Sequence, residues 1–167
     1  MRRICLLMVM FTLAAPAVGL ASDHAAGDGS LGISAANGSV VVKGHGVIYG
    51  HFDQGTLTVV DYKADDSTSL PSVSNARGRA THGGIVYSGS DVRFLLPSGR
   101  YTIELVATNV NASAVGKGTV VVTGAGTADD GTVTVNGGRP VPLSRVSLSQ
   151  VFGTSTSSNS SASGKGN

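Results

Sequence analysis

The 167-residue sequence is poor in the side chains that stabilise or equip many small exported proteins. It contains one cysteine, Cys5, one glutamate, Glu104, and no tryptophan. A single cysteine cannot form a disulfide within the chain, so the folded part must be stabilised by burial of apolar side chains. With one glutamate and no GxSxG motif, neither a carboxylate pair for acid–base chemistry nor a hydrolase nucleophile is recognisable. We therefore predict no catalytic residues and no enzymatic activity.

The first 21 residues have the pattern of a secretory signal peptide. Arg2 and Arg3 precede an apolar stretch from residue 4 to about residue 15, and the small residues Gly19 and Ala21 follow. The apolar stretch is too short to span a bilayer, and no later run is long enough. Cys5 lies before the apolar stretch, whereas a lipoprotein signal places its cysteine at the cleavage site. The pattern predicts a protein that is secreted or associated with the cell envelope, without a transmembrane segment after cleavage.

The excess of positive charge belongs to this signal peptide. The 12 Lys and Arg of the whole chain fall to 10 when Arg2 and Arg3 are removed, which balances the 10 Asp and Glu. A mature chain without net charge lacks the electrostatic footprint of a nucleic-acid-binding protein. We expect no nucleic-acid partner.

Composition divides the mature chain into three parts. Residues 22–37 are small and polar, which predicts a flexible leader in which Leu31 and Ile33 could pack at the domain edge. Residues 38–153 suit one β-domain with one core. Residues 154–167 form a Ser- and Thr-rich stretch without a large apolar side chain, which predicts a disordered tail.

Residues 38–61 show a strict alternation of side chains. Val40, Val42, Ile48 and Phe52 share one parity with three glycines, and mixed polar residues share the other. Glycines 44, 46 and 50 would leave room for a neighbouring strand or a large side chain, or would let the strand coil sharply. The turn residues 53–55 predict a hairpin, with residues 56–61 as the returning strand.

The remaining domain is expected to contain further strands. Pro97, Ser98 and Gly99 predict a second hairpin between residues 84–96 and 101–109. Residues 63–81 read as the longest irregular loop, with a short strand near 70–74, and residues 109–116 as a connection. Further strands are expected at 118–124, 131–137, 139–143 (an edge strand because of Pro140 and Pro142) and 146–152. These segments predict an all-β fold: a single antiparallel β-sandwich or partly closed barrel of about seven to nine strands.

A short local pattern recurs: glycine, Ser or Thr, an apolar residue, any residue, then valine. It begins at Gly38, Gly55, Gly118 and Gly131, so its offsets are unequal. A solenoid or β-helix would require a constant period. We interpret the recurrence as strands that each begin after a glycine turn.

Few residues qualify as binding candidates. Tyr49 and Tyr62 could face outward as a thin aromatic platform for sugar rings, and Arg77 and Arg79 could contribute cations for an anionic glycan or phosphate. Strand geometry separates His45 and His51 by about 20 Å, which argues for surface histidines and against a shared metal site. The acidic group Asp61, Asp65 and Asp66 lacks the spacing of a calcium loop. We expect no metal and no cofactor.

The order of several motifs resembles that of a known group of proteins. The runs GHGVIYGHFDQGTLTVVD, VYSGSDVRFLLPSGRYTIEL, NASAVGKGTVVVTG and GGRPVPL, with a closing VFG, are similar to a group of small exported actinobacterial all-β proteins. The likeness spans about residues 42–153. No activity is assigned to that group, so the resemblance implies an exported β-domain and no catalytic residues. The Ser-rich tail and the Ser- and Asp-rich stretch 63–81 depart from the pattern.

Three function hypotheses follow. The first is a non-enzymatic envelope or extracellular domain that acts through contacts with a protein or a cell-wall component. The alternative is a weak glycan-binding module that uses the two tyrosines and the arginines. A small hydrolase is the least favoured reading.

Overall fold

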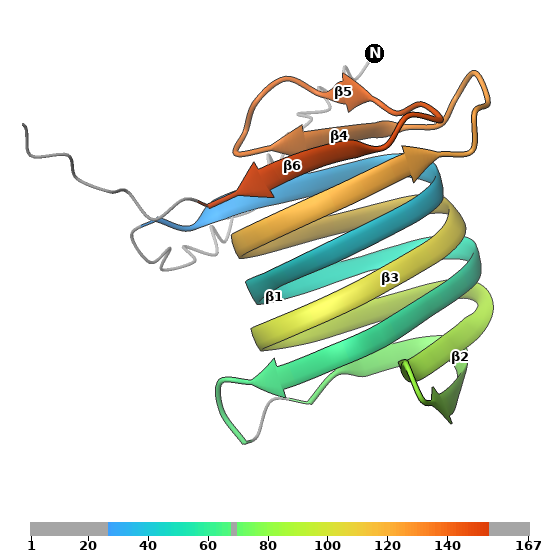
Figure 1. Cartoon of the computed structure of the whole chain (residues 1–167). Helices are drawn as coiled ribbons and strands as arrows, with labels where there is room; N and C mark the ends of the chain where they lie inside the picture. Colours follow the sequence, from blue (N-terminus) through green and yellow to red (C-terminus); the bar gives the residue numbers. More distant parts are fainter. Residues whose placement is uncertain (1–26, 68–69, 154–167) are drawn as a thin grey trace, which may run out of the picture.

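Two very long strands form most of the molecule. β1 (Gly29–Ala64) has 36 residues and β3 (Gly84–Gly124) has 41 residues in the computed structural model, which describes residues 27–67 and 70–153. The two strands run antiparallel, and β1 pairs with β3 along both of its edges. They therefore wind together as adjacent turns of one flattened coil (Figure 1).

Four shorter strands extend this coil at its ends. β2 pairs with β3 at one end, while β4, β5 and β6 lie at the other end (Figure 1). Their bounds are Ser72–Thr81 for β2, Thr132–Val135 for β4, Val141–Pro142 for β5 and Leu148–Phe152 for β6. The resulting sheet is open, because β2 and β5 are the ends of the strand order and do not pair with each other.

One turn of the coil takes 17 or 18 residues. Val40 and Leu57 both pair with Leu105, one on each side of it, although 17 positions separate them in the sequence. The spacing between Gly38 and Gly55 has the same origin, since both pair with Ala107. The offset of 17 in the recurring glycine pattern thus marks a turn of the coil, while the other offsets do not.

Small residues stack at the two corners where the strands fold over. The first corner consists of residues paired in succession: Gly29, Gly116, Gly46, Gly99 and Ala64. The second corner is built in the same way from Gly124, Gly38, Ala107, Gly55, Gly89 and Ala76. A Cβ at Gly46 would lie 2.1 Å from the carbonyl oxygen of Val115, so a larger residue could not pass this corner without a shift of the backbone.

The corners divide the coil into two layers, which we call the first face and the second face. The first face contains seven antiparallel segments in this order: β6, 118–122 of β3, 39–45 of β1, 100–106 of β3, 56–63 of β1, 85–88 of β3 and 77–81 of β2. The second face is ordered β5, β4, 31–34 of β1, 112–115 of β3, 47–52 of β1, 92–96 of β3 and 72–74 of β2.

One apolar core fills the space between the two faces. Its largest fully buried side chains come from both layers and include Tyr101, Phe52, Phe152, Leu31, Ile48, Leu57, Leu96, Ile103 and Leu105. Val40, Val42, Ile48 and Phe52 all point inward, so the alternation predicted from the sequence is confirmed along this part of β1. The glycine prediction is also confirmed: the Phe152 ring lies across Gly44 and Gly118, and Gly46 lies at a corner.

The predicted all-β antiparallel architecture is confirmed, but its connectivity differs from the expectation. Both predicted hairpins are wrong, because the chain continues as a strand through residues 53–55 and through Pro97, Ser98 and Gly99. At these points the strand turns from one face to the other and then pairs with the other long strand. Local turn residues therefore marked the corners of a coil and not reversals of the chain.

Three further segments differ from the sequence expectation. Residues 29–37, predicted as part of a flexible leader, form the start of β1, although the suggested packing of Leu31 and Ile33 is confirmed by their burial. Much of the stretch 63–81, predicted as a loop with a short strand near 70–74, forms the longer strand β2. Residues 109–116, predicted as a connection, belong to β3 and bury Val110.

The C-terminal elements largely follow the prediction. β4 and β6 form where strands were expected, and β5 is a short edge strand that contains Pro142. Phe152 is fully buried, whereas Val146 is 77% exposed and takes no part in the core.

The predicted signal peptide at 1–21 and the predicted tail at 154–167 lie outside the described residues. Within the part that is described, no helix is long and apolar enough to cross a membrane.

Candidate functional site

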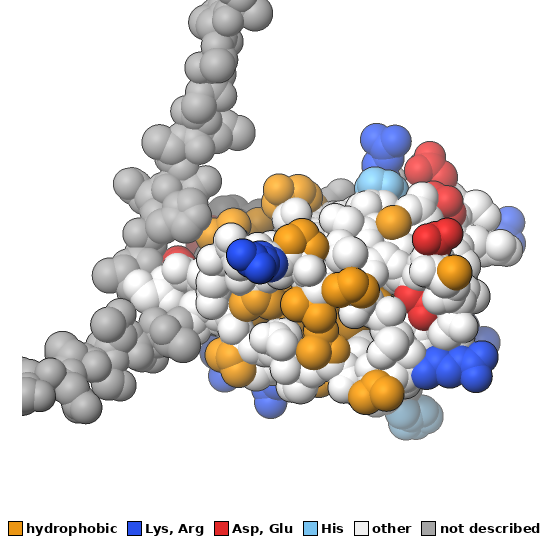
Figure 2. Space-filling model, turned by 90° about the horizontal axis from the view of Figure 1, so that it is seen from above, with side chains coloured by type: hydrophobic (Ala, Val, Ile, Leu, Met, Phe, Trp, Pro, Cys, Tyr) orange, Lys and Arg blue, Asp and Glu red, His pale blue; other side chains and the backbone are white. Residues whose placement is uncertain are grey.

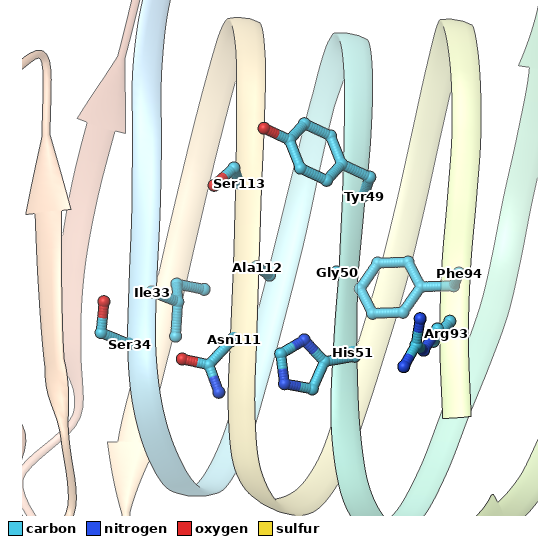
Figure 3. A pocket seen from close by; sticks show the side chains of 10 residues that line it. All are labelled: Ile33, Ser34, Tyr49, Gly50, His51, Arg93, Phe94, Asn111, Ala112 and Ser113. Atoms are coloured by element: carbon cyan, nitrogen blue, oxygen red, sulfur yellow. The ribbon is translucent and has the colours of Figure 1, made fainter. Parts of the chain in front are cut away.

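A shallow groove of about 540 Å³ crosses the outer side of the second face (Figure 3). It spans neighbouring segments of β1 and β3. The lining residues are Ile33, Ser34, Tyr49, Gly50, His51, Arg93, Phe94, Asn111, Ala112 and Ser113. None of these ten residues is Asp or Glu, so the groove does not hold the pair of carboxylates that glycoside hydrolysis commonly uses.

The strand register brings the outward side chains of the groove together. Tyr49 is paired with Leu95 on one side and Ser113 on the other. Two positions along the strand, His51 lies between Arg93 and Asn111. Residues directly opposite each other in an antiparallel pair have Cβ atoms about 4.5–5.5 Å apart, so these side chains form two adjacent rows across three strand segments.

Small residues form the floor between these rows. Gly50 lies between Tyr49 and His51 in sequence, and a Cβ there would lie 2.4 Å from the carbonyl oxygen of Asn111. Ala112, opposite Gly50, contributes only a methyl group. The two backbones can therefore approach closely, and the polar side chains stand around a floor made mostly of main chain.

Hydrogen bonds hold one polar member of the groove in place. The Asn111 amide donates to the carbonyl oxygen of Asn109 at 3.0 Å, and its Oδ1 accepts from the backbone N–H of Ala35 at 3.1 Å. Arg93 is 71% exposed at its side chain, and its Nε lies 4.0 Å from Asp91 Oδ1. The groove therefore combines a fixed amide with a guanidinium group that is open to solvent.

The structure separates the four binding candidates predicted from the sequence. Tyr49 lies in the groove and is 51% exposed. Arg77 and Arg79 are exposed on β2 and project from the first face, opposite Ser88 and Val86. A single platform of the two tyrosines and the arginines is therefore not formed.

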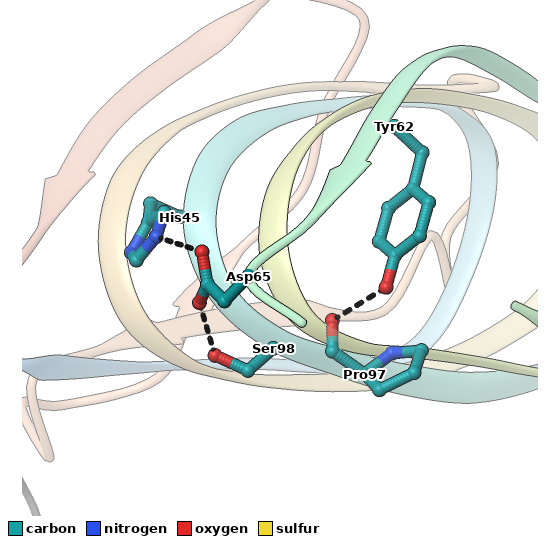
Figure 4. Close-up of polar contacts among 5 residues, drawn as sticks. All are labelled: His45, Tyr62, Asp65, Pro97 and Ser98. Carbon is teal, nitrogen blue, oxygen red and sulfur yellow. Dashed lines mark hydrogen bonds and ion pairs between the residues drawn. The ribbon is translucent and has the colours of Figure 1, made fainter. Parts of the chain in front are cut away.

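Tyr62 points inward, contrary to the expectation. Its ring packs against the core, and its hydroxyl donates to the carbonyl oxygen of Pro97 at 3.3 Å (Figure 4). The cause is a register shift between Val59 and Asp61, which pair with consecutive residues of β3. One extra residue reverses the inward and outward parity of the strand, so simple alternation from Leu57 and Val59 places Tyr62 on the wrong side.

A second polar cluster joins the end of β1 to the first corner (Figure 4). Asp65 accepts a hydrogen bond from Ser98 Oγ at 2.6 Å, and its other carboxylate oxygen lies 2.9 Å from His45 Nε2. The hydrogen bond from Ser98 is the main cause of the lowered pKa of the Asp65 carboxyl, and the bond with His45 lowers this pKa further. A small depression of about 320 Å³ lies beside the cluster, bordered also by Lys63 and Arg100.

The order of the three groups argues against nucleophilic catalysis. In a serine hydrolase the imidazole lies between the hydroxyl and the carboxylate and removes the hydroxyl proton. In this cluster the Asp65 carboxylate lies between Ser98 and His45 and bonds to both, so the imidazole is not the group that would remove the hydroxyl proton. The arrangement instead ties residue 65 to two neighbouring turns of the coil.

The histidines are placed as the sequence suggested where they are described. His45 projects from the first face and His51 from the second, so the sandwich separates them. His82 lies in the turn between β2 and β3, and His24 is outside the described residues. Across 27–67 and 70–153, no group of three or more His, Cys, Asp or Glu side chains could hold a metal ion.

Sequence reasoning missed Asp130, which lies in the loop between β3 and β4. Asp130 is 2% exposed and accepts hydrogen bonds from the backbone N–H groups of Gly126 and Thr127 and from the Thr127 hydroxyl. The bond from the Thr127 hydroxyl is the main cause of the lowered pKa of this carboxyl. An Asp three residues after a Thr in a glycine-containing loop was the only available signal.

The chain has no significant match among protein-family models, curated proteins or solved structures.

Proposed function

We propose that the mature chain is a non-enzymatic β-domain exported from the cell, and that it acts by binding a glycan chain of the cell envelope in the groove of the second face. The proposal rests on one observation: an exposed Tyr49 ring lines the same groove as His51, Arg93 and Asn111, and a floor of main chain lies between them. An amphipathic ring can cover the apolar side of a sugar, while the polar side chains bind its hydroxyl groups.

The shape of the groove favours a polymer over a small ligand. Deep sites for small molecules enclose most of the ligand, whereas this groove is shallow and lies on the outer side of a sheet. An extended glycan could lie across several strand segments and contact both rows of side chains. Shallow, polar contact of this kind supports weak binding per site.

Export is supported by the sequence features of residues 1–21, and an envelope location is compatible with the resemblance of residues 42–153 to small exported proteins. A protein partner at the envelope is the second reading of the same features. It differs from the first in that the groove itself would not be needed for binding.

The decisive experiment is a glycan array with the mature chain, followed by calorimetry on each glycan that binds. We expect Tyr49→Ala to weaken binding at least about tenfold, since loss of an aromatic contact removes both buried area and ring stacking. The matched control is Val106→Ala, because Val106 is 53% exposed and projects from the first face. Equal loss in both variants, or no glycan above background, would remove the glycan proposal.

A separate experiment tests the envelope location. We would fractionate the native host and apply in-cell cross-linking with mass spectrometry. Recovery in the wall fraction with one repeatedly captured partner supports an envelope interaction domain. Recovery in the medium with no partner contradicts it and directs attention to soluble glycans.

A further inference from the structure

Among residues 27–67 and 70–153, the longest strand edge without a neighbouring strand belongs to β2. This strand has ten residues and pairs only with β3, so no described strand lies along its other edge on either face of the coil. At the opposite end, β5 has two residues and contains Pro142, and β6 has five. Figure 2 shows that opposite end, where apolar side chains reach the surface; Val141 of β5 is 40% exposed.

The outer side of the β2 edge is cationic. Arg77 and Arg79 are two positions apart, so both project outward from the first face. Their cross-strand neighbours, Ser88 and Val86, carry no charge. Neither arginine forms an ion pair with any residue in the described part of the chain. Both guanidinium groups are therefore available to an incoming anion.

The inner side of the same edge is apolar and incompletely covered. Gly78 is opposite Tyr87, and Ala80 is opposite Ile85. The Tyr87 ring extends over Gly78, since a Cβ at Gly78 would lie 3.0 Å from Tyr87 Cε1. Ile85 is 43% exposed. A further strand would place its inward side chains beside Gly78 and Ala80, which are small enough to let them reach Tyr87 and Ile85 and complete the end of the core.

We propose that the β2 edge binds an extended peptide segment of a partner protein, in which acidic and apolar residues alternate. The peptide adds to β2 as another strand through main-chain hydrogen bonds. Its acidic side chains face Arg77 and Arg79, and its apolar side chains cover Tyr87 and Ile85. This site lies on a different part of the molecule from the glycan groove, and neither proposal depends on the other.

The same arginines select against a second copy of this edge. If two β2 edges paired antiparallel, Arg77 or Arg79 of one chain would lie close to an arginine of the other. Like charges directly opposite each other destabilise a strand pair, and charged side chains are a common protection of free edges. An acidic strand meets no such repulsion, so the charge of the edge supplies specificity as well as attraction.

The test uses the full mature chain and a capped seven-residue peptide of alternating valine and glutamate, measured by calorimetry. The comparison peptide has the same composition with its valines and glutamates in two blocks. We expect only the alternating peptide to bind. The double variant Arg77→Glu and Arg79→Glu should weaken this binding about tenfold or more and should bind an alternating valine–lysine peptide instead. Arg139→Glu, an exposed arginine near β5, is the matched control and should leave binding unchanged.

Main-chain pairing is tested with N-methylated peptides. A strand at an edge directs the N–H groups of alternate residues toward its partner. Methylation at one parity should therefore abolish binding, and methylation at the other parity should leave it nearly intact. Equal effects of both methylations, an unchanged affinity in the double variant, or no binding by the alternating peptide would overturn the proposal.

Discussion

Gly46 and Gly116 are paired with each other at the first corner of the coil, and both have φ of +138°. A Cβ on Gly46 would lie 2.1 Å from the Val115 carbonyl oxygen, and a Cβ on Gly116 would lie 2.1 Å from the His45 carbonyl oxygen. Two long strands can thus fold over side by side because neither carries a side chain at that point.

We expect Gly46→Ala to lower the free energy of unfolding by at least about 1–3 kcal/mol, because it combines an unfavourable φ with a backbone clash. Urea unfolding followed by circular dichroism provides the measurement. Gly32→Ala on the same strand is the control, since the nearest atom to a Cβ there is 3.8 Å away. A similar small effect in both variants would contradict the close approach at the corner.

Phe152 closes the core at one end of the first face. It is fully buried, and its ring lies across Gly44 and Gly118. We expect Phe152→Ala to destabilise the fold by about 3–5 kcal/mol, as is usual for removal of a buried aromatic ring. Val151→Ala, at a position that is 54% exposed, should change stability by less than about 0.5 kcal/mol. If the two variants unfold at the same urea concentration, β6 does not contribute to the core.

Tyr101 carries a buried hydroxyl group without a hydrogen-bond partner in the described structure. The residue is fully buried, and this burial raises the pKa of its hydroxyl. Since an unpaired buried hydroxyl costs about 1–3 kcal/mol, Tyr101→Phe should leave stability unchanged or raise it. Tyr62→Phe is the contrasting variant and should lower stability by about 0.5–1.5 kcal/mol, because it removes the bond to Pro97. Marked destabilisation by Tyr101→Phe would indicate a partner for this hydroxyl.

Asp130 should make stability depend on pH in the acid range. Hydrogen bonds lower its pKa below the ordinary 3.8 in the folded state, so the unfolded chain binds its proton more readily. Its contribution is present above the unfolded pKa and is lost as the pH falls through the lower folded pKa. We therefore expect Asp130→Asn to be less stable than the wild type at about pH 6 and to approach the stability of the wild type as the pH falls below 3.8, the ordinary pKa of this carboxyl.

The measurement for Asp130 is thermal unfolding across this pH range. Asp129→Asn, a change at the exposed neighbouring carboxyl, controls for the loss of one charge. A wild-type advantage that persists unchanged at the lowest pH would show that ionisation of Asp130 is not its source.

The sequence alone determined which side chains form the core along most strands. Val40, Val42, Ile48 and Phe52 are buried as their alternation predicts, because a strand directs successive side chains to opposite sides. The all-β class and the place of Tyr49 on the surface follow from the same rule. The composition by itself also showed that the chain cannot form an internal disulfide and that it contains a single glutamate.

Only the tertiary structure decided what the glycines do. Gly55 and Gly99 can end a strand in a turn or carry it around a corner, and both outcomes use the same local chemistry. The choice depends on pairing between residues far apart, as when Val40 and Leu57 come to lie on either side of Leu105. The inward position of Tyr62 depends in the same way on a register shift that no local pattern marks. Neither the groove beside Tyr49 nor the edge of β2 that carries Arg77 and Arg79 could be predicted from the sequence. Each is formed by the register of strands that pair across long separations in the chain.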